Sequence, residues 1–222
     1  MTLWLKESRP EMITLSLGLL AVLILNRKKI SGSFLSLKQD PRKWIWEVWK
    51  EWGEPFVIAV ILALVIRTFL IGPYKIPTGS METTLMVGDR IFVDKLSYRF
   101  REAKRGEVVV FKYPVDPKKD FVKRLVAFGG EEVEIRDGNA YINGKKLDQP
   151  DIFQSRYYYN RNDWDYGKEG QHFKVPEGMF FVLGDNSAHS SDSRNWGFVP
   201  RKDLIGRAVL VWWPPKRIGS VH

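Results

Sequence analysis

A serine beside a glycine follows directly on an apolar stretch of the chain. Residues 77–81 (PTGSM) come shortly after an apolar segment that ends near Ile71. Gly79 can adopt backbone conformations that are closed to other residues, so the chain can present Ser80 at a sharp bend. Gly-Ser pairs are also common in ordinary turns. Because a serine hydroxyl is a weak nucleophile until a neighbour removes its proton, a chemical role for Ser80 requires a base elsewhere in the chain.

Two candidate bases are present, a lysine and His189. Lys123 lies in a run that reads as a β-strand, where Phe121, Lys123 and Leu125 point to one face. An unperturbed lysine has a pKa of about 10.4, and burial must lower it by roughly 2–3 for the amine to act near neutrality. That asks burial to disfavour the ammonium by about 3–4 kcal/mol. A lysine on an edge strand with a solvated head is the competing interpretation. Arg124 is excluded as a base because a guanidinium does not deprotonate in proteins.

A polar loop, residues 184–194 (GDNSAHSSDSR), offers side chains that could hold the base. Ser190 could orient a neutral lysine amine, and Asp192 could pair with Arg194 to fix the loop. The same side chains could instead hydrogen-bond the loop's own backbone. A Ser–His–Asp arrangement using His189 is a further alternative. His189 lies three residues before Asp192, which is close for two side chains that must face one another, so we favour the lysine.

The composition excludes several kinds of site. There are no cysteines in the 222 residues, so disulfides, thiolate nucleophiles and cysteine-based metal sites are ruled out. The three histidines, His172, His189 and His222, argue against a multi-histidine zinc site. The formal net charge of +9 suits either nucleic acid or an anionic membrane surface. Nine tryptophans, many of them beside apolar runs, favour the membrane.

Two apolar runs precede the serine. Residues 12–25 are uncharged and become just long enough for a bilayer span of roughly 17–25 residues when their neighbours are included. A cleavable export signal and a buried helix are the alternatives, and we favour the span. Residues 56–71 form the second run, interrupted by Arg67, whose head can reach the interface. We therefore expect transmembrane helices at 1–26 and 55–72.

A basic, tryptophan-rich link, residues 27–54, joins the two runs. Its lysines and arginines predict that it stays cytoplasmic, and its indoles suit the headgroup layer. A tryptophan-rich core helix is less favoured because charged residues are interleaved. With the link inside, residues 73–222 are extracytoplasmic. Much of the basic excess lies in the link, so membrane topology explains the charge and we expect no nucleic-acid partner.

From residue 73 the pattern changes to short apolar runs separated by turn residues. Asp137-Gly138 and Asn143-Gly144 are hairpin-turn pairs, and helical periodicity is scarce, so the fold class is mainly β. Residues 144–175 are polar and tyrosine-rich, and we expect a cap insertion at about 137–175. Strands are predicted at 90–93, 107–111, 121–128, 133–135, 140–142, 179–183 and 208–212.

The order of motifs resembles that of bacterial type I signal peptidases, also called leader peptidases. The resemblance covers about residues 56–213 and begins with a membrane segment. The motifs that follow are PTGSMETTL (77–85), GDRIFVDK (88–95), GEVVVFKYP (106–114), VKRLVAFGG (122–130) and LGDNSAHSSDSRNWGFVP (183–200). The resemblance implies a catalytic domain built on a twisted antiparallel β-sheet with a smaller β cap.

The same resemblance implies a mechanism and a substrate. Ser80 would be the nucleophile and Lys123 the general base, with an oxyanion hole formed by the backbone amide of Ser80 and the hydroxyl of Thr78. The substrates would be signal-peptide-bearing preproteins, cut after a small-x-small motif outside the cell membrane. No metal or organic cofactor is expected, because a base and an oxyanion hole suffice for acyl transfer. The residues that would support the site are Ser190, Asp192 and Arg194.

The chain departs from the pattern that it resembles at several positions. Thr78 stands where serine is usual, Thr84 where proline is usual, and residues 129–131 (GGE) where proline-glycine-aspartate is common. Residues 187–189 (SAH) stand where arginine, aspartate and asparagine are frequent. None of these changes removes a proposed catalytic atom. The alternatives to a signal peptidase are a catalytically inactive, membrane-tethered module that binds peptides, and the hydrolase that would use His189.

Overall fold

The computed structural model describes residues 40–66 and 70–222. The chain divides into two compact units, Met1–Ala63 and Leu64–His222. The transmembrane helix expected at 1–26 and the first part of the link lie outside the described residues.

The described part of the first unit is helical. Helix α3 (Pro41–Val48) begins after Asp40, whose carboxylate accepts hydrogen bonds from two amides of the first turn at 3.0 and 3.2 Å. The π-helical turn η1 (Trp49–Gly53) and helix α4 (Glu54–Val65) follow without a break. Residues 41–54, expected as part of a polar link, are thus helical throughout. Among the residues that the structure describes, no helix combines the length and hydropathy that crossing a bilayer requires.

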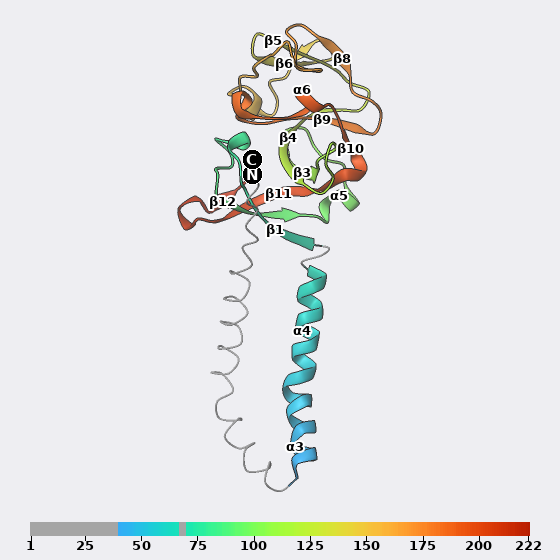
Figure 1. Cartoon of the computed structure of the whole chain (residues 1–222), viewed down its shortest axis with the longest axis vertical. Coiled ribbons are helices and arrows are strands. Elements are labelled where there is room, and N and C mark those ends of the chain that lie inside the picture. The colour runs from blue at the N-terminus through green and yellow to red at the C-terminus, as the bar shows by residue number, and fades with distance from the viewer. Residues whose placement is uncertain (1–39, 67–69) are drawn as a thin grey trace. The chain divides into compact units, whose positions relative to one another are not determined.

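The second unit is mainly antiparallel β, as predicted (Figure 1). Its larger sheet has the order β1-β2-β11-β3-β4-β9-β10, with β12 beside β11. The strands are β1 (Ile71–Lys75), β2 (Arg90–Asp94), β3 (Val108–Lys112), β4 (Asp120–Phe128), β9 (Met179–Leu183), β10 (Val199–Pro200), β11 (Leu204–Trp213) and β12 (Gly219–Ser220).

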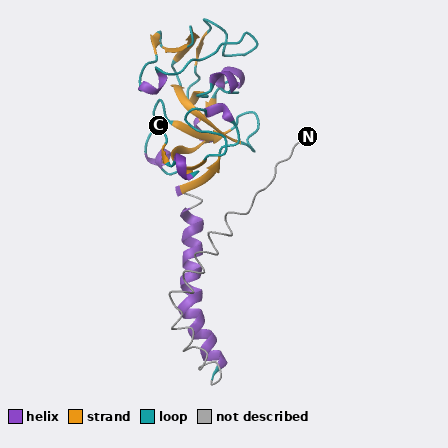
Figure 2. Cartoon of the chain, turned by 90° about the vertical axis from the view of Figure 1, so that its left-hand side faces the viewer, coloured by secondary structure: helices purple, strands orange, loops and turns teal. Residues whose placement is uncertain are grey.

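Helices in the second unit are short turns between strands (Figure 2). This scarcity matches the weak helical periodicity of the sequence. The α-helical turns are α5 (Ser97–Phe100) and α6 (Ser193–Trp196). The 3-10 turns are η3 (Gly79–Met81), η4 (Asp151–Phe153), η5 (Ser187–His189), η6 (Arg201–Asp203) and η7 (Pro215–Arg217).

The start of β1 corrects the expected end of the second apolar segment. We expected helix through residue 72, but Ile71 pairs with Asp94 and Gly72 with Val93 in an antiparallel ladder with β2. An apolar run by itself does not distinguish a buried helix from a strand. Here β2 supplies hydrogen-bonding partners for the backbone, and the strand forms.

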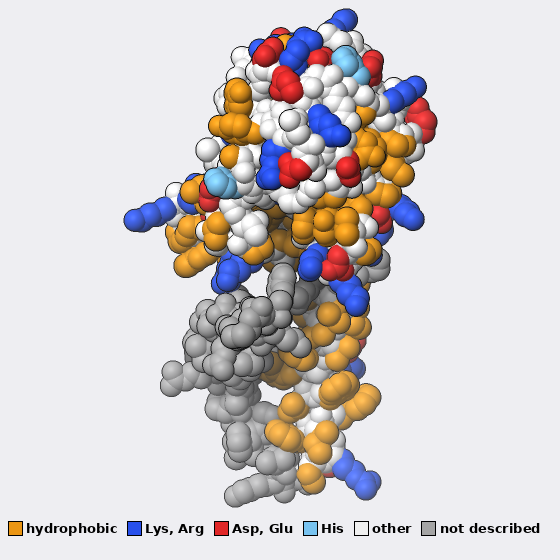
Figure 3. Space-filling model, turned by 45° about the horizontal axis from the view of Figure 1, so that its top comes forward, with side chains coloured by type: hydrophobic (Ala, Val, Ile, Leu, Met, Phe, Trp, Pro, Cys, Tyr) orange, Lys and Arg blue, Asp and Glu red, His pale blue; other side chains and the backbone are white. Residues whose placement is uncertain are grey.

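A smaller four-stranded sheet has the order β7-β6-β5-β8. Strands β5 and β6 meet at Asp137-Gly138, where both residues have positive φ, 50° and 73°, as the predicted hairpin turn requires. In the upper part of Figure 3, lysine, arginine and acidic side chains are interspersed over the surface, as is usual where a protein faces solvent. The strands are β5 (Glu132–Arg136), β6 (Asn139–Ile142), β7 (Lys145–Lys146) and β8 (His172–Lys174).

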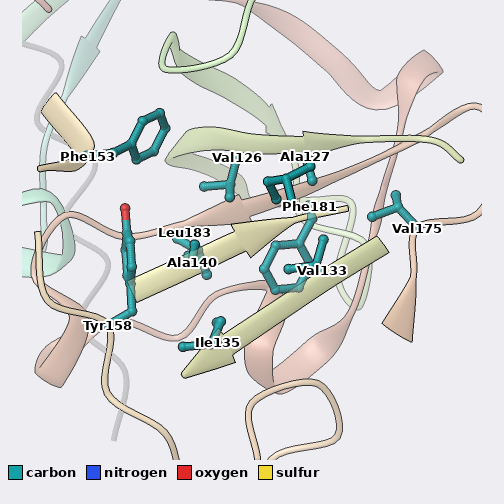
Figure 4. Close-up of a cluster of buried hydrophobic side chains, with 11 residues drawn as sticks. Val126, Ala127, Val133, Ile135, Ala140, Phe153, Tyr158, Val175, Phe181 and Leu183 are labelled. Carbon is teal, nitrogen blue, oxygen red and sulfur yellow. The ribbon is translucent and has the colours of Figure 1, made fainter. Parts of the chain in front are cut away.

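One buried apolar cluster joins the two sheets (Figure 4). It combines side chains of β4 and β9 in the larger sheet with side chains of β5 and β6 in the smaller one. Phe153 and Tyr158, from the irregular segment between β7 and β8, complete it at 3% and 2% exposure. This cluster therefore fixes β4 and the segment between β7 and β8, residues 147–171, on a common core. We refer to residues 147–171 as the cap segment. The members of the cluster from the two sheets are Val126, Ala127, Val133, Ile135, Ala140, Ile142, Phe181 and Leu183.

Candidate active site

Ser80 lies on the 3-10 turn η3, between β1 and β2. Thr78 enters the turn with extended backbone, φ −133° and ψ 154°. Met81 and Leu85 follow with no exposed surface, and their burial anchors the turn in the core. Ser80 itself is 7% exposed. The bend expected from the sequence is therefore present and is held by packing on its C-terminal side.

Gly79 serves the turn in a different way from the one that the sequence suggests. Its φ is not positive, so conformational freedom is not what the turn uses. A Cβ at this position would instead lie 2.6 Å from a carboxylate oxygen of Glu82. A larger residue at this position would therefore have to displace the Glu82 carboxylate from the turn.

Asn186 clamps the serine turn from the loop after β9. Its backbone amide donates to the carbonyl of Ser80 at 3.1 Å, and its side-chain amide donates to the carbonyl of Gly79 at 3.0 Å. The same side chain reaches the Glu82 carboxylate at 3.2 Å. The carbonyls of two successive peptides, Gly79–Ser80 and Ser80–Met81, are thereby satisfied, which fixes the orientation of the turn.

Lys123 is on β4, an interior strand between β3 and β9, and it is 4% exposed. Its Nζ lies 2.6 Å from Ser80 Oγ and 5.6 Å from the ring centroid of Phe121. Burial lowers the pKa of Lys123 from its ordinary 10.5 to about 8, while the carboxylates of Asp192 and Asp185 act in the opposite direction. The interior strand and the burial exclude the solvated edge-strand interpretation.

Asp192 and Arg194 form a fully buried, two-pronged ion pair, with N–O distances of 2.8 and 2.7 Å. Asp192 also accepts a hydrogen bond from the amide of Gly184 at 2.9 Å. Arg194 donates to the carbonyl of Tyr159 and to Ser187 Oγ, both at 2.6 Å. The pair therefore ties the end of β9 and the polar loop to the cap segment.

Ser190 and Thr78 are placed near Ser80 and Lys123, without a side-chain hydrogen bond to either among the described residues. The Ser190 hydroxyl is buried and has no hydrogen-bond partner among the described residues. It packs against Gly184, where an added Cβ would overlap its oxygen and lie 2.7 Å from the Ser80 carbonyl. Thr78 is exposed and makes no side-chain capping bond to η3. A bond from Ser190 to the Lys123 amine stays a prediction.

His189 is not placed to act on Ser80 through Asp192. It is exposed on η5, and both carboxylate oxygens of Asp192 are engaged by Arg194. Ser80 Oγ contacts the lysine amine instead. In the described part of the chain, no group of three or more histidine or acidic side chains is arranged to hold a metal ion.

A second buried ion pair involves Arg124, the neighbour of Lys123 on β4, and was not predicted from the sequence. Arg124 and Asp185 have no exposed side-chain surface and meet through N–O distances of 2.7 and 2.6 Å. Arg124 also donates to the carbonyl of Gly106 at 2.5 Å. The available signal was an arginine between Val122 and Val126 in an apolar strand, because a buried charge requires a partner.

Comparison with known proteins identifies similar sequences. Residues 49–213 match a family described as signal peptidase, peptidase S26. The chain is 45% identical over 177 residues to a probable signal peptidase I-2 of Synechocystis sp., covering 77% of this chain and 76% of that protein. It is 39% identical over 165 residues to signal peptidase I T of Bacillus subtilis, covering 74% and 85%. A crystal structure of a signal peptidase I from Enterococcus faecalis aligns with a TM-score of 0.40 and 32% identity over 48% of this chain and 97% of that one.

Proposed function

Because the chain belongs to the signal peptidase family, peptidase S26, we propose that Ser80 and Lys123 are the catalytic dyad with which it removes signal peptides from exported preproteins. The protein is a serine peptidase of the signal peptidase I type. The observation that carries the dyad is the 2.6 Å contact between a buried Lys123 amine and Ser80 Oγ. A hydroxyl and a base within hydrogen-bonding distance are what nucleophilic catalysis requires.

In the first step, the neutral amine of Lys123 takes the proton of the Ser80 hydroxyl while Oγ attacks the carbonyl of the scissile peptide. The resulting lysine ammonium gives the proton to the leaving amine, which leaves an acyl ester on Ser80. Water then attacks that ester and gives a proton to the same amine. The ammonium passes the proton to Ser80 Oγ as the ester bond breaks, which releases the signal peptide with a free carboxyl end. With a pKa of about 8, about a tenth of the lysine is neutral at pH 7, compared with less than about a thousandth for an unperturbed lysine.

The developing oxyanion would be met by the backbone amide of Ser80 and the hydroxyl of Thr78. The extended backbone of Thr78 at the entrance of η3 and its exposure support this role, because a donor to the substrate must face the open side of the turn. Asp192 and Arg194 would brace the loop behind the dyad. Ser190 would contact the lysine amine, since its buried hydroxyl has no other partner among the described residues.

Membrane attachment belongs to the same proposal. Residues 1–26 and the apolar segment from residue 55 would anchor the chain in the cell membrane, with 27–54 cytoplasmic and 73–222 outside. The sequence of α4, EPFVIAVILALV, supports this, because a helix that is apolar on all sides suits lipid. The second anchor must end before Ile71, where β1 begins. An enzyme held in the membrane meets a membrane-anchored substrate at a high effective concentration.

The proposal is tested by cleavage of a signal-bearing preprotein by the purified full-length chain in detergent. Wild type should cleave, with kcat/KM rising through an apparent pKa near 8. Ser80→Ala and Lys123→Ala should lose cleavage while remaining folded. His189→Ala is the matched control and should cleave as wild type does, because His189 is exposed and Asp192 is already paired.

Two other outcomes would overturn the proposal. Activity that survives Lys123→Ala but not His189→Ala would assign the base to the histidine. A folded wild-type chain that binds signal-bearing peptides without cutting them would be the inactive, membrane-tethered module.

A further inference from the structure

One arginine of the cap segment reaches the loop that carries the serine. Arg156 donates from Nη1 to Thr83 Oγ1 at 2.7 Å and from Nη2 to Thr84 Oγ1 at 2.9 Å. Its Nη2 also lies 3.3 Å from Asp185 Oδ2. A single guanidinium therefore joins the cap segment, the loop after β9 and the loop between β1 and β2 that carries Ser80. We refer to this last loop, residues 76–89, as the serine loop.

The backbone on both sides of Arg156 is fixed in the core. Phe153 and Tyr158 flank it and are 3% and 2% exposed, and both belong to the cluster in Figure 4. The next residue, Tyr159, donates its amide to Ser187 Oγ at 2.8 Å. The Arg156 side chain is itself only 9% exposed. Little conformational freedom is left to the guanidinium. Its contacts therefore hold the serine loop in place, and the guanidinium does not simply adjust to the position of the loop.

Thr84 connects the Arg156 contact to a larger hydrogen-bond network. Its hydroxyl donates to Asp185 Oδ2 and accepts from Arg124 at 3.1 Å as well as from Arg156. Asp185 is consequently shared by two cations, Arg124 at 2.6 Å and Arg156 at 3.3 Å. Because Arg124, Arg156 and Asp185 are linked by hydrogen bonds, a change in one of them alters the electrostatic effect of the whole network on a buried neighbour.

The charge on Asp185 bears on the dyad. The carboxylates of Asp192 and Asp185 favour the ammonium form of Lys123, and the guanidinium of Arg194 disfavours it. Each carboxylate is offset by an arginine, Asp192 by Arg194 and Asp185 by the pair described above. Of the two acidic residues of the serine loop, Glu82 is held by the side chain of Asn186 at 3.2 Å and Asp89 by Arg217 at 3.0 Å. Removing one cation from Asp185 leaves more uncompensated negative charge facing the lysine.

We propose that Arg156 is a positioning residue for the peptidase reaction: it fastens the serine loop to the cap segment and, by sharing Asp185 with Arg124, offsets negative charge that favours the ammonium form of Lys123. The inference rests on the proposed Ser80–Lys123 dyad. It gives the cap a role in catalysis, because the cap supplies both the hydrogen bonds that hold Thr83 and Thr84 and the second cation on Asp185. The arginine fork is needed for the first role and its charge for the second.

Arg156→Gln separates this role from a purely structural one. The variant should lower kcat several-fold with KM within about twofold. In the pH profile of kcat/KM, the apparent pKa of the acidic limb should rise by about half a unit. The reason is that a lysine facing more negative charge holds its proton to higher pH. Arg156→Lys keeps the charge and loses the fork, so its kcat should fall while its acidic limb stays near that of wild type.

Arg161→Gln is the matched control. Arg161 lies in the same cap segment, but its ion pair with Asp163 is exposed, at 58% and 64% of the two side chains. Its removal should leave the rate and the pH profile unchanged. If Arg156→Gln does not fold, Thr83→Val tests the positioning role, since it removes one exposed contact with Arg156. It should lower kcat with an unchanged acidic limb, and an unchanged kcat would overturn that role.

The outcomes separate this inference from the function on which it rests. If Lys123→Ala cleaves as well as wild type, the dyad is wrong whatever Arg156 does. If Lys123→Ala is inactive and Arg156→Gln has the wild-type rate and pH profile, the dyad stands and the role of Arg156 is overturned. A loss of thermal stability in Arg156→Gln with an unmoved acidic limb would likewise overturn the electrostatic role.

Discussion

Two neighbouring cations on β4, Lys123 and Arg124, are both buried, at 4% and 0% exposure, yet their surroundings differ. Arg124 meets a buried carboxylate, Asp185, through two short contacts and also donates to the carbonyl of Gly106. Lys123 contacts the hydroxyl of Ser80 and forms no ion pair with any residue in the described ranges.

The difference shows how one strand can hold a structural cation beside the residue that we propose as the base. A buried cation that has no ion-pair partner loses the solvation that stabilises its charge. This loss lowers the pKa of Lys123 to about 8. A buried arginine keeps its charge and recovers part of the lost solvation from a carboxylate and a carbonyl. Arg124 thereby fastens β4 to the loop that bears Asn186, which in turn holds the serine turn.

The largest expected effect comes from making the two neighbours alike. Lys123→Arg keeps a positive charge but cannot accept a proton near neutrality, so kcat/KM should fall by about 1000-fold or more. The measurement is preprotein cleavage by equal amounts of folded protein, judged by circular dichroism. Substantial activity in Lys123→Arg would mean that the amine is not the base.

Next in size is the loss of the partner of Asp185. Arg124→Met leaves a carboxylate buried without its main cation and should lower the free energy of unfolding by about 3–5 kcal/mol, measured by urea denaturation. The double variant Arg124→Met/Asp185→Leu should regain part of that loss because no charge is left buried. If the free energy of unfolding of Arg124→Met lay within about 1 kcal/mol of the wild-type value, the ion pair would not be what holds β4 to the loop.

Lys123→Met should stabilise the fold at neutral pH. The folded-state pKa of about 8 lies below the ordinary 10.5, so below pH 8 the folded protein bears the whole cost of a buried ammonium, about 3 kcal/mol. Wild-type stability should rise between pH 8 and 10.5, since the unfolded chain binds the extra proton there. The advantage of Lys123→Met should therefore vanish above pH 10.5. A difference that does not vary with pH would contradict the lowered pKa.

The smallest effect is expected at an exposed ion pair. Arg201 and Glu102 meet at 2.6 Å, the same separation as Arg124 and Asp185, but their side chains are 53% and 70% exposed. Glu102→Gln should change the free energy of unfolding by less than about 1 kcal/mol, and salt should reduce that difference further. A larger loss would mean that pairing distance, rather than burial, sets the strength of these interactions.

The sequence could predict those features that depend on near neighbours. The hairpin turn at Asp137-Gly138 was found because both residues tolerate positive φ. The strand carrying Lys123 was found from its apolar run, and Ser80 from its place after an apolar segment. The strand β1 was missed because its apolar start suits a helix equally well, and only pairing with β2 decides between them.

The chain by itself determined which groups are available: a serine in a tight turn, a lysine in an apolar strand, a polar loop and no cysteine. Tertiary structure decided which of them meet. Ser80 and Lys123 are 43 positions apart, and Arg124 and Asp185 are 61, so each contact depends on strand order rather than on local preference. The role of Gly79, the clamp of Asn186 and the reach of Arg156 follow from the same cause, because a side chain's partner is set by what the fold packs against it.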